Sequence, residues 1–114
     1  MIIVDRNTGR KIDYAVDGTK LSFADGELTL NLARYQQDIA VTKDIMADSE
    51  GFLTTGRGLY YIAQVEIPAR AYETVPVETE EEEEETQQTE LRPVPLDMDE
   101  VTLYLFSVEG ILLQ

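Results

Sequence analysis

The sequence predicts an all-β protein in which an antiparallel meander and a long central hairpin form a small β-sandwich or barrel. The first observation is a series of short alternating segments within residues 1–55, separated by turn residues at intervals of about 8–12 residues. The second is a pair of longer apolar runs, 59–67 and 101–108, which are rich in aromatic and β-branched residues and have the length of strands. At 114 residues the chain has the size of one domain, 1–114, which carries a low-complexity acidic loop at 78–90.

The first part of the chain is expected to form the meander. Strand character is found at 1–4, 11–16, 20–24 and 27–32. Asp17-Gly18 and Asp25-Gly26 are strong signals for hairpin turns, and Gly9 suits the positive φ of a bulged hairpin between the first two strands. Four strands joined by tight turns would place one face toward the core.

The link to the second half is less regular. Residues 33–38 break the alternation, and either one helical turn or a bend between two sheets fits them. Strand character resumes at 39–46 and again in the short segment 52–55, with a turn between them at 48–51. Gly56-Arg57-Gly58 then forms a flexible corner that leads into the longer runs.

The two longer runs are expected to pair as an antiparallel hairpin, because sequence neighbours tend to lie side by side in sheets. Residues whose numbers sum to about 168 would face each other, so that Ile67 meets Val101 and Leu59 meets Glu109. Apolar residues on both faces of the runs predict strands that are covered on both sides. Phe106 is therefore predicted to be buried, and the tyrosines of the hairpin are assigned to core and cross-strand packing: Tyr60, Tyr61 and Tyr104.

The hairpin continues beyond these runs into two arms that contain prolines, at 68 and 76 on one side and at 93 and 95 on the other. Proline cannot donate a ladder hydrogen bond, so these arms are expected to be edge-like, bent or only partly paired. Pro68 favours a bend that folds the arm back over a second sheet, and the alternative is a projecting ribbon. In both cases the apolar residues of the arms are predicted to be buried, by the second sheet or by a neighbouring chain: Tyr72, Val75, Val77, Val94 and Leu96.

Most of the net charge of −14 comes from one stretch. Residues 78–90 hold eight glutamates and no base, and the other 101 residues carry a net charge of −6. This balance argues against nucleic acid and anionic membranes as partners, because phosphates are bound by Lys and Arg. The central glutamates form either a solvated, self-repelling loop or a site that captures a basic protein: Glu80, Glu81, Glu82, Glu83, Glu84 and Glu85. As a plain loop, residues 79–89 could be replaced by a short Gly/Ser link without loss of stability.

The chain ends in three apolar residues, Ile111, Leu112 and Leu113. Exposed apolar residues are unusual at a terminus, so these three are expected either to complete the core as a last strand or to dock on a neighbouring protein. The first alternative is favoured.

No catalytic, metal or cofactor site is expected. The chain contains neither Cys nor His, which excludes Ser-His-Asp and Cys-His catalysis, disulfides and Cys-based zinc sites. The acidic residues Asp44, Asp48 and Glu50 do not have the spacing of a calcium loop and are better explained by a turn. No signal peptide or membrane span is evident, so the protein is expected in the cytoplasm or in a phage particle, for the reason given next.

Four segments resemble known proteins: 5–9 (DRNTG), 28–33 (LTLNLA), 65–70 (VEIPAR) and 98–103 (MDEVTL). In these segments the chain is similar to small uncharacterised proteins that are encoded in prophages of Gram-positive bacteria, near tail and structural genes. The resemblance contains no catalytic or binding motif, and it implies a component of a phage particle or of its assembly.

Two hypotheses of function therefore compete. The first is a non-enzymatic structural or assembly protein, whose partner is another protein or a second copy of itself. The second is a regulatory or inhibitory module whose acidic loop captures a basic protein. Binding of the second kind would weaken as salt increases.

Overall fold

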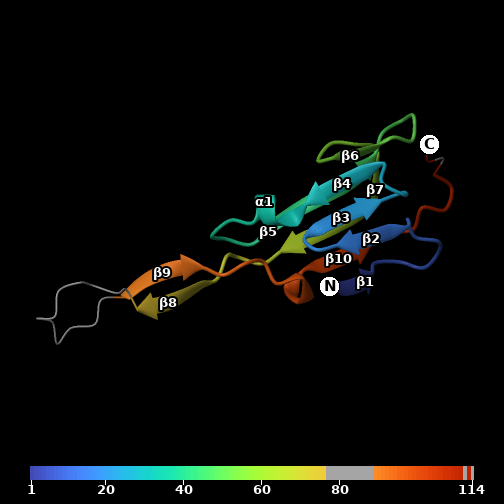
Figure 1. Ribbon diagram of the computed structural model, residues 1–114. Helices are drawn as coiled ribbons and strands as arrows, with labels where there is room; N and C mark the ends of the chain where they lie inside the picture. Colours follow the sequence, from blue (N-terminus) through green and yellow to red (C-terminus); the bar gives the residue numbers. More distant parts are fainter. Residues whose placement is uncertain (77–88, 112, 114) are drawn as a thin grey trace, which may run out of the picture.

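The computed structural model describes residues 1–76, 89–111 and 113, and it confirms the all-β prediction (Figure 1). Ten strands form a five-stranded sheet, a three-stranded sheet and a two-stranded ribbon. The strands are β1 (Ile2–Asp5), β2 (Tyr14–Asp17), β3 (Lys20–Phe23), β4 (Leu28–Asn31), β5 (Val41–Ala47), β6 (Leu53–Thr55), β7 (Tyr60–Ile67), β8 (Tyr72–Pro76), β9 (Thr89–Pro93) and β10 (Thr102–Leu105). One short helix, α1 (Leu32–Tyr35), and one 3-10 turn, η1 (Met98–Glu100), complete the described elements.

The three-stranded sheet, in the order β2-β3-β4, is the predicted meander without its first strand. Gly18 and Thr19 connect β2 to β3, and residues 24–27 connect β3 to β4. Both connections use positive φ, at Gly18 (61°) and at Gly26 (94°), as the two Asp-Gly signals predict. The inner face of this sheet is apolar and fully or almost fully buried, at Leu21, Phe23 and Leu30.

The five-stranded sheet has the order β1-β10-β7-β5-β6, with the predicted hairpin of β7 and β10 at its centre. The predicted register is confirmed over the whole of β10, because Thr102 lies opposite Glu66 and Leu105 lies opposite Ala63. The expected pairing of Leu59 with Glu109 is wrong. The Leu59 N–H donates to the Ala47 carbonyl at 2.7 Å, and the Val108 N–H donates to the Arg10 carbonyl at 2.7 Å, so the two runs separate beyond Phe106.

The first strand does not belong to the meander. β1 pairs with β10 in parallel, with Ile3 opposite Leu103, and so lies at the edge of the other sheet. Gly9 does have positive φ (121°), but it stands in a link between the sheets and not in a bulged hairpin. A Cβ at Gly9 would overlap the Ser107 side chain, so the close approach of two segments also requires glycine there.

The central strands are covered on one face only, which corrects the expectation of cover on both sides. The residues of β7 and β10 that face the three-stranded sheet, such as Val65, Ile67 and Leu103, have no exposed surface. On the outer face Tyr61 is 48% exposed, and Phe106 is half-buried with its ring 5.6 Å from that of Tyr61. Tyr60 is 44% exposed, and so the hairpin tyrosines are not core residues. Aromatic residues favour strands whether the strand is central or half-exposed, which is why composition misled here.

The helix α1 carries the chain from one sheet to the other. The helical turn and the bend between two sheets, which were the two alternatives for residues 33–38, therefore occur together. Leu32 is fully buried at its start, and Gln36, which follows it, is the buried polar residue of the described chain, at 9% exposure. The strand that follows begins at Val41, later than predicted, and leaves Ile39 69% exposed.

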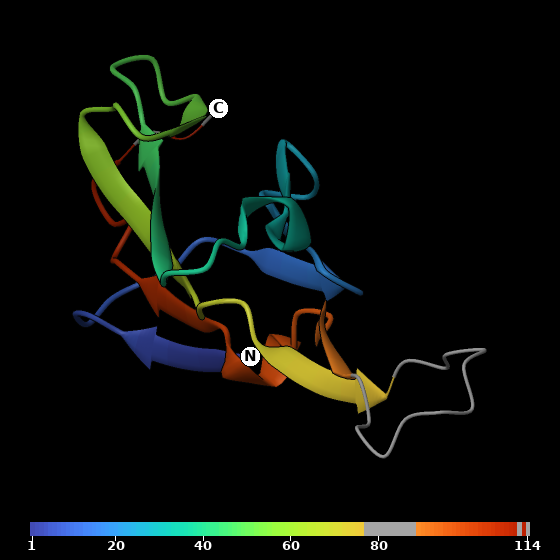
Figure 2. The ribbon, with the colours of Figure 1, turned by 90° about the vertical axis from the view of Figure 1, so that its left-hand side faces the viewer.

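The arms of the hairpin project from the domain, contrary to the expected bend at Pro68 (Figures 1 and 2). The molecule measures 70 × 22 × 22 Å, and its radius of gyration of 19.5 Å exceeds the ~13 Å of a compact chain of this length. β8 and β9 pair only with each other and form a ribbon beyond the end of the sandwich. β7 ends at Ile67, and the chain continues past Pro68 into β8 at Tyr72 without folding back over the sandwich (Figure 1).

The C-terminal segment contributes to the core without forming a strand. Ile111 and Leu113 are half-buried and pack against the main hydrophobic cluster, so the favoured alternative is right about contact with the core, but neither residue lies in a strand. Leu112 lies outside the described residues.

Phe23 and Phe106 offer a test of this arrangement. We expect Phe23→Ala to lower the free energy of unfolding by about 3–5 kcal/mol, because a fully buried aromatic side chain is removed from the core. Phe106→Ala should cost about half of that or less, since the ring lies on the open face of the sheet. Urea unfolding of both variants measures the difference, and equal losses would contradict the one-sided sheet.

Candidate protein-interaction surface

The β8–β9 ribbon has one charged and one uncharged face. The two strands are antiparallel, with Tyr72 opposite Pro93 and Thr74 opposite Leu91. Since side chains alternate along a strand, one face carries only uncharged residues: Tyr72, Thr74, Pro76, Thr89, Leu91 and Pro93. We call these six residues the uncharged face. The opposite face carries Glu73, Glu90 and Arg92, with an ion pair of 2.7 Å between Arg92 and Glu90.

The uncharged face is open to solvent in the single chain. Leu91 is 69% exposed and Tyr72 is 45% exposed. Large apolar residues exposed together on a projecting element are typical of contact surfaces.

The edges of the ribbon are poorly suited to pairing with a further strand. The Val94 N–H donates to the Ala71 carbonyl at 2.8 Å, so residues 71 and 94 form a hydrogen-bonded pair. Every second pair of an antiparallel ladder is of this kind, so the pairs 73–92 and 75–90 are hydrogen-bonded and the pairs between them are not. The N–H groups at positions 76 and 93 would therefore point away from the ribbon, and both positions are prolines. These prolines cost no bond within the ribbon and remove a donor from each outer edge.

The base of the ribbon is held to the domain by a group of hydrogen bonds to residues 36–38, which we call the bracket. The Arg70 N–H donates to the Gln37 carbonyl at 2.7 Å, and its guanidinium donates to the Gln36 carbonyl at 2.8 Å. The Tyr72 hydroxyl donates to the Asp38 carboxylate at 2.6 Å. From the other side, the buried Gln36 amide donates to the Pro68 carbonyl at 3.2 Å. The bracket directs the ribbon away from the sandwich.

The predicted interaction residues do not share one surface. Tyr72 belongs to the uncharged face, whereas Val75 and Val94 are half-buried on the charged face, and Leu96 packs against the core. Within the single chain Tyr72 is exposed, so burial by a second sheet of the same chain is wrong for this residue, and burial by a neighbouring chain stays a prediction. Val77 and the six glutamates at 80–85 lie outside the described residues. Glu90, assigned to the acidic loop, lies within β9.

Sequence reasoning missed Leu91 and the two outward prolines. Leu91 is flanked by charged residues, Glu90 and Arg92, and so gave no apolar run. The signal that would have found it is the pairing itself, because residues of the ribbon face each other when their numbers sum to 165.

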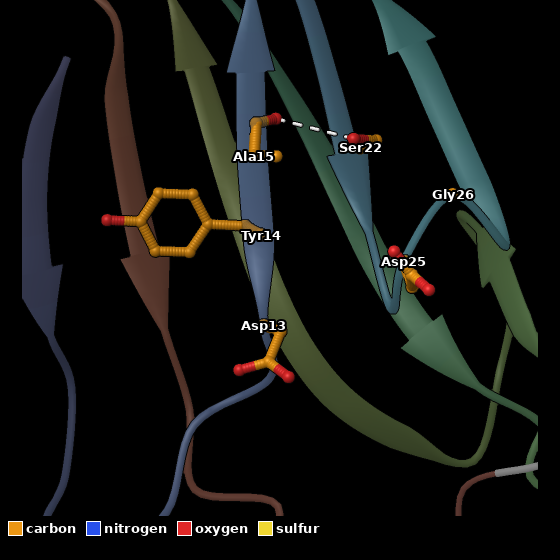
Figure 3. A pocket seen from close by; sticks show the side chains of 6 residues that line it. All are labelled: Asp13, Tyr14, Ala15, Ser22, Asp25 and Gly26. Atoms are coloured by element: carbon orange, nitrogen blue, oxygen red, sulfur yellow. Dashed lines mark hydrogen bonds between the residues drawn. The ribbon is translucent and has the colours of Figure 1, made fainter.

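A hollow of about 520 Å³ lies on the outer side of the three-stranded sheet (Figure 3). It is lined by Asp13, Tyr14, Ala15, Ser22, Asp25 and Gly26. The Ser22 hydroxyl donates to the Ala15 carbonyl at 3.5 Å, and the Asp13 and Asp25 carboxylates lie apart, one before β2 and the other in the turn after β3 (Figure 3). The hydroxyl bonds to a backbone carbonyl and not to either carboxylate, and we assign no chemistry to the hollow.

Asp48 and Glu50 lie in the predicted turn, whereas Asp44 lies in β5. The Asp48 carboxylate accepts hydrogen bonds from the N–H groups of Glu50 (2.9 Å) and Phe52 (3.0 Å). The Asp44 carboxylate accepts one from the Gln64 amide at 2.9 Å, on the neighbouring strand. Within the described residues no group of acidic side chains has the arrangement of a metal site.

One polar cluster lies on the open face of the five-stranded sheet. The Tyr104 hydroxyl donates to the Glu66 carboxylate at 3.0 Å, and the Arg6 guanidinium lies 4.0 Å from the centre of the Tyr104 ring. The hydrogen bond to Glu66, with partial desolvation and the negative charge of Glu66, raises the pKa of Tyr104, and Arg6 opposes this shift.

Comparison with known proteins identifies no relative: no family model, no curated protein and no solved structure matches the chain. Over residues 1–76, 89–111 and 113, neither the length nor the apolar character needed to cross a membrane is found in any helix.

We expect Arg70→Ala to loosen the ribbon. Loss of the guanidinium bonds to Gln36 and Asp38 frees the base of a two-stranded element that is marginal by itself. Amide exchange in β8 and β9 should accelerate about tenfold, as hydrogen bonds to charged groups are worth about 1.5–3 kcal/mol. Arg92→Ala is the control, since it removes only the solvent-exposed pair with Glu90. Equal exchange in both variants would show that the bracket does not hold the ribbon.

We expect Tyr104 to lose its proton at a higher pH than an ordinary tyrosine. Its pKa in the folded state is raised above that of the unfolded chain, so the contribution of the Tyr104–Glu66 contact is complete at neutral pH. That contribution should be lost as the pH rises through the raised pKa. Absorbance titration of the phenolate should show a late-titrating group that is missing in Tyr104→Phe, and identical curves would contradict the assignment.

Proposed function

We propose that the protein is a non-enzymatic structural or assembly component that binds another protein through the uncharged face of the β8–β9 ribbon. The observation that carries this proposal is the ribbon itself, which projects from the sandwich with Leu91 69% exposed. The contact is one of apolar and polar uncharged side chains, so its partner is expected to offer a complementary uncharged surface.

The low stability of an isolated ribbon favours a state in which a partner covers it. A two-stranded ribbon is marginally stable alone in water, and cover on one face supplies the missing apolar burial. The bracket already fixes its base and direction, which lowers the entropy lost when a partner binds.

The chemistry of the face favours protein over nucleic acid. None of its six residues is basic, and nucleic acids are held mainly through contacts of Lys and Arg with phosphate. The proposed place of action, a phage particle or the cytoplasm in which it is assembled, depends on the sequence resemblance to prophage-encoded proteins.

The test places a photo-crosslinking amino acid at position 91, on the uncharged face, in the cells that produce the protein. We expect crosslinks to one protein, or to a second copy, from position 91. The matched control at position 92 carries the same group on the opposite face and should give few. Equal yields from both positions, or none from position 91, would overturn the proposal.

A second arm of the experiment distinguishes this proposal from the hypothesis that the acidic segment captures a basic protein. Replacing 78–88 by a Gly/Ser link leaves Thr89 in its pair with Pro76 and removes seven glutamates. The crosslinks from position 91 should persist and should be insensitive to salt. If they vanish on this replacement, or weaken steeply with salt, capture of a basic protein by the acidic segment explains the binding instead.

A further inference from the structure

The outer edge of β1 is a free strand edge. Among the described strands β1 pairs with β10 alone, and the N–H groups of Ile2 and Arg6 donate to the carbonyls of Val101 and Leu105, both at 2.8 Å. In a parallel ladder alternate residues face the partner strand, so positions 2, 4 and 6 face β10. The backbone N–H and C=O groups of Ile3 and Asp5 therefore point outward from the sheet.

This edge lacks the usual protection against pairing. β1 contains no proline and no lysine, whereas each outer edge of the ribbon carries a proline at an outward position. Its first three side chains are apolar, and two of them are accessible, with Ile2 51% and Ile3 39% exposed. At the opposite edge of the same sheet, β6 has only three residues.

We propose that two copies of the chain join through β1, in antiparallel register about a two-fold axis, so that their five-stranded sheets become one continuous sheet. This interface is separate from the ribbon and goes beyond the function proposed above. Unpaired edge strands are a common site of such strand addition.

The side chains of β1 favour a second copy as the occupant. With Ile3 opposite Ile3 of the second copy, Ile2 faces Val4 on the other side of the sheet, and every pair within residues 2–4 is apolar. The other registers that align the outward groups of β1 itself place Asp5 opposite Ile3 or opposite the other Asp5. Like charges directly opposite destabilise a sheet, so one register is preferred.

The interface is short, and this determines how the association behaves. Four residues a side bury less than the about 800 Å² per partner of a standard interface, so the dimer should be weak and dependent on concentration. Two chains of net charge −14 repel each other, and salt screens that repulsion. Dimerisation should therefore strengthen as salt is raised, the opposite of capture by the acidic segment.

Sedimentation of the full chain tests the proposal over a range of about 10⁻⁶ to 10⁻³ M. The wild type should shift from monomer to dimer, and Ile3→Pro should weaken the dimer about tenfold or more, because it removes an outward donor and no bond to β10. Ile3→Thr, which keeps the N–H, should still dimerise. A wild type that stays monomeric, or an Ile3→Pro variant that dimerises like it, would overturn the proposal.

A second pair of variants serves if Ile3→Pro does not fold. Ile2→Lys places a charge opposite Val4 of the second copy and should also weaken the dimer, although it reduces the net negative charge. Val16→Lys makes the same change of charge on the exposed edge strand of the other sheet and should leave dimerisation intact. Equal effects of the two lysines would contradict the proposal. If a ribbon variant such as Leu91→Ser still dimerises, the β1 interface does not depend on the ribbon contact of the proposed function.

Discussion

The antiparallel pairing of β7 with β10 is the constraint on which the rest of the structure depends. It joins residues 63–66 to 102–105, which are far apart in sequence, and each strand then recruits a further neighbour. β7 pairs with β5, and β10 pairs in parallel with β1. Beyond the domain the same two segments pair again, with residues 72 and 93 opposite each other, so the ribbon continues the central hairpin in a register whose residue numbers sum to 165 and not to 168. Closing so long a loop carries an entropic cost, which the fully buried row of Val65, Ile67 and Leu103 offsets.

Those parts of the fold that depend on local chemistry could be predicted from the sequence. The Asp-Gly turns placed β2, β3 and β4, and the two apolar runs gave the register of β7 and β10. The position of β1 could not be predicted, because its partner lies about a hundred residues away and its local turn residues resemble those of a hairpin. The open outer face was missed for another reason. Tyr61 and Phe106 suit a half-exposed strand as well as a buried one, so their identity does not reveal whether a second layer covers them.

The candidate surface shows a similar limit. Hydrophobicity selected Tyr72, Val75, Val94 and Leu96, but whether two residues share a face depends on the register of pairing. Val75 and Val94 lie on the charged face, and the uncharged face gains Leu91 from a segment that is polar in sequence. The prolines were correctly associated with edges, yet their effect is specific. At positions 76 and 93 they leave the ladder intact and block its outer sides, so the ribbon can make contacts through its face more readily than through its edges.

The ribbon and β1 would then serve two different contacts without competing. The ribbon extends along the direction of β7, at the end of a molecule 70 Å long, whereas β1 lies along the side of the sandwich (Figures 1 and 2). β1 is parallel to β10, and β7 is antiparallel to β10, so β1 and β7 run in opposite directions. A two-fold axis that sets two β1 strands antiparallel also reverses the direction of β7 in the second copy. The two ribbons of such a dimer would therefore point away from each other, and each would present its uncharged face to a separate partner.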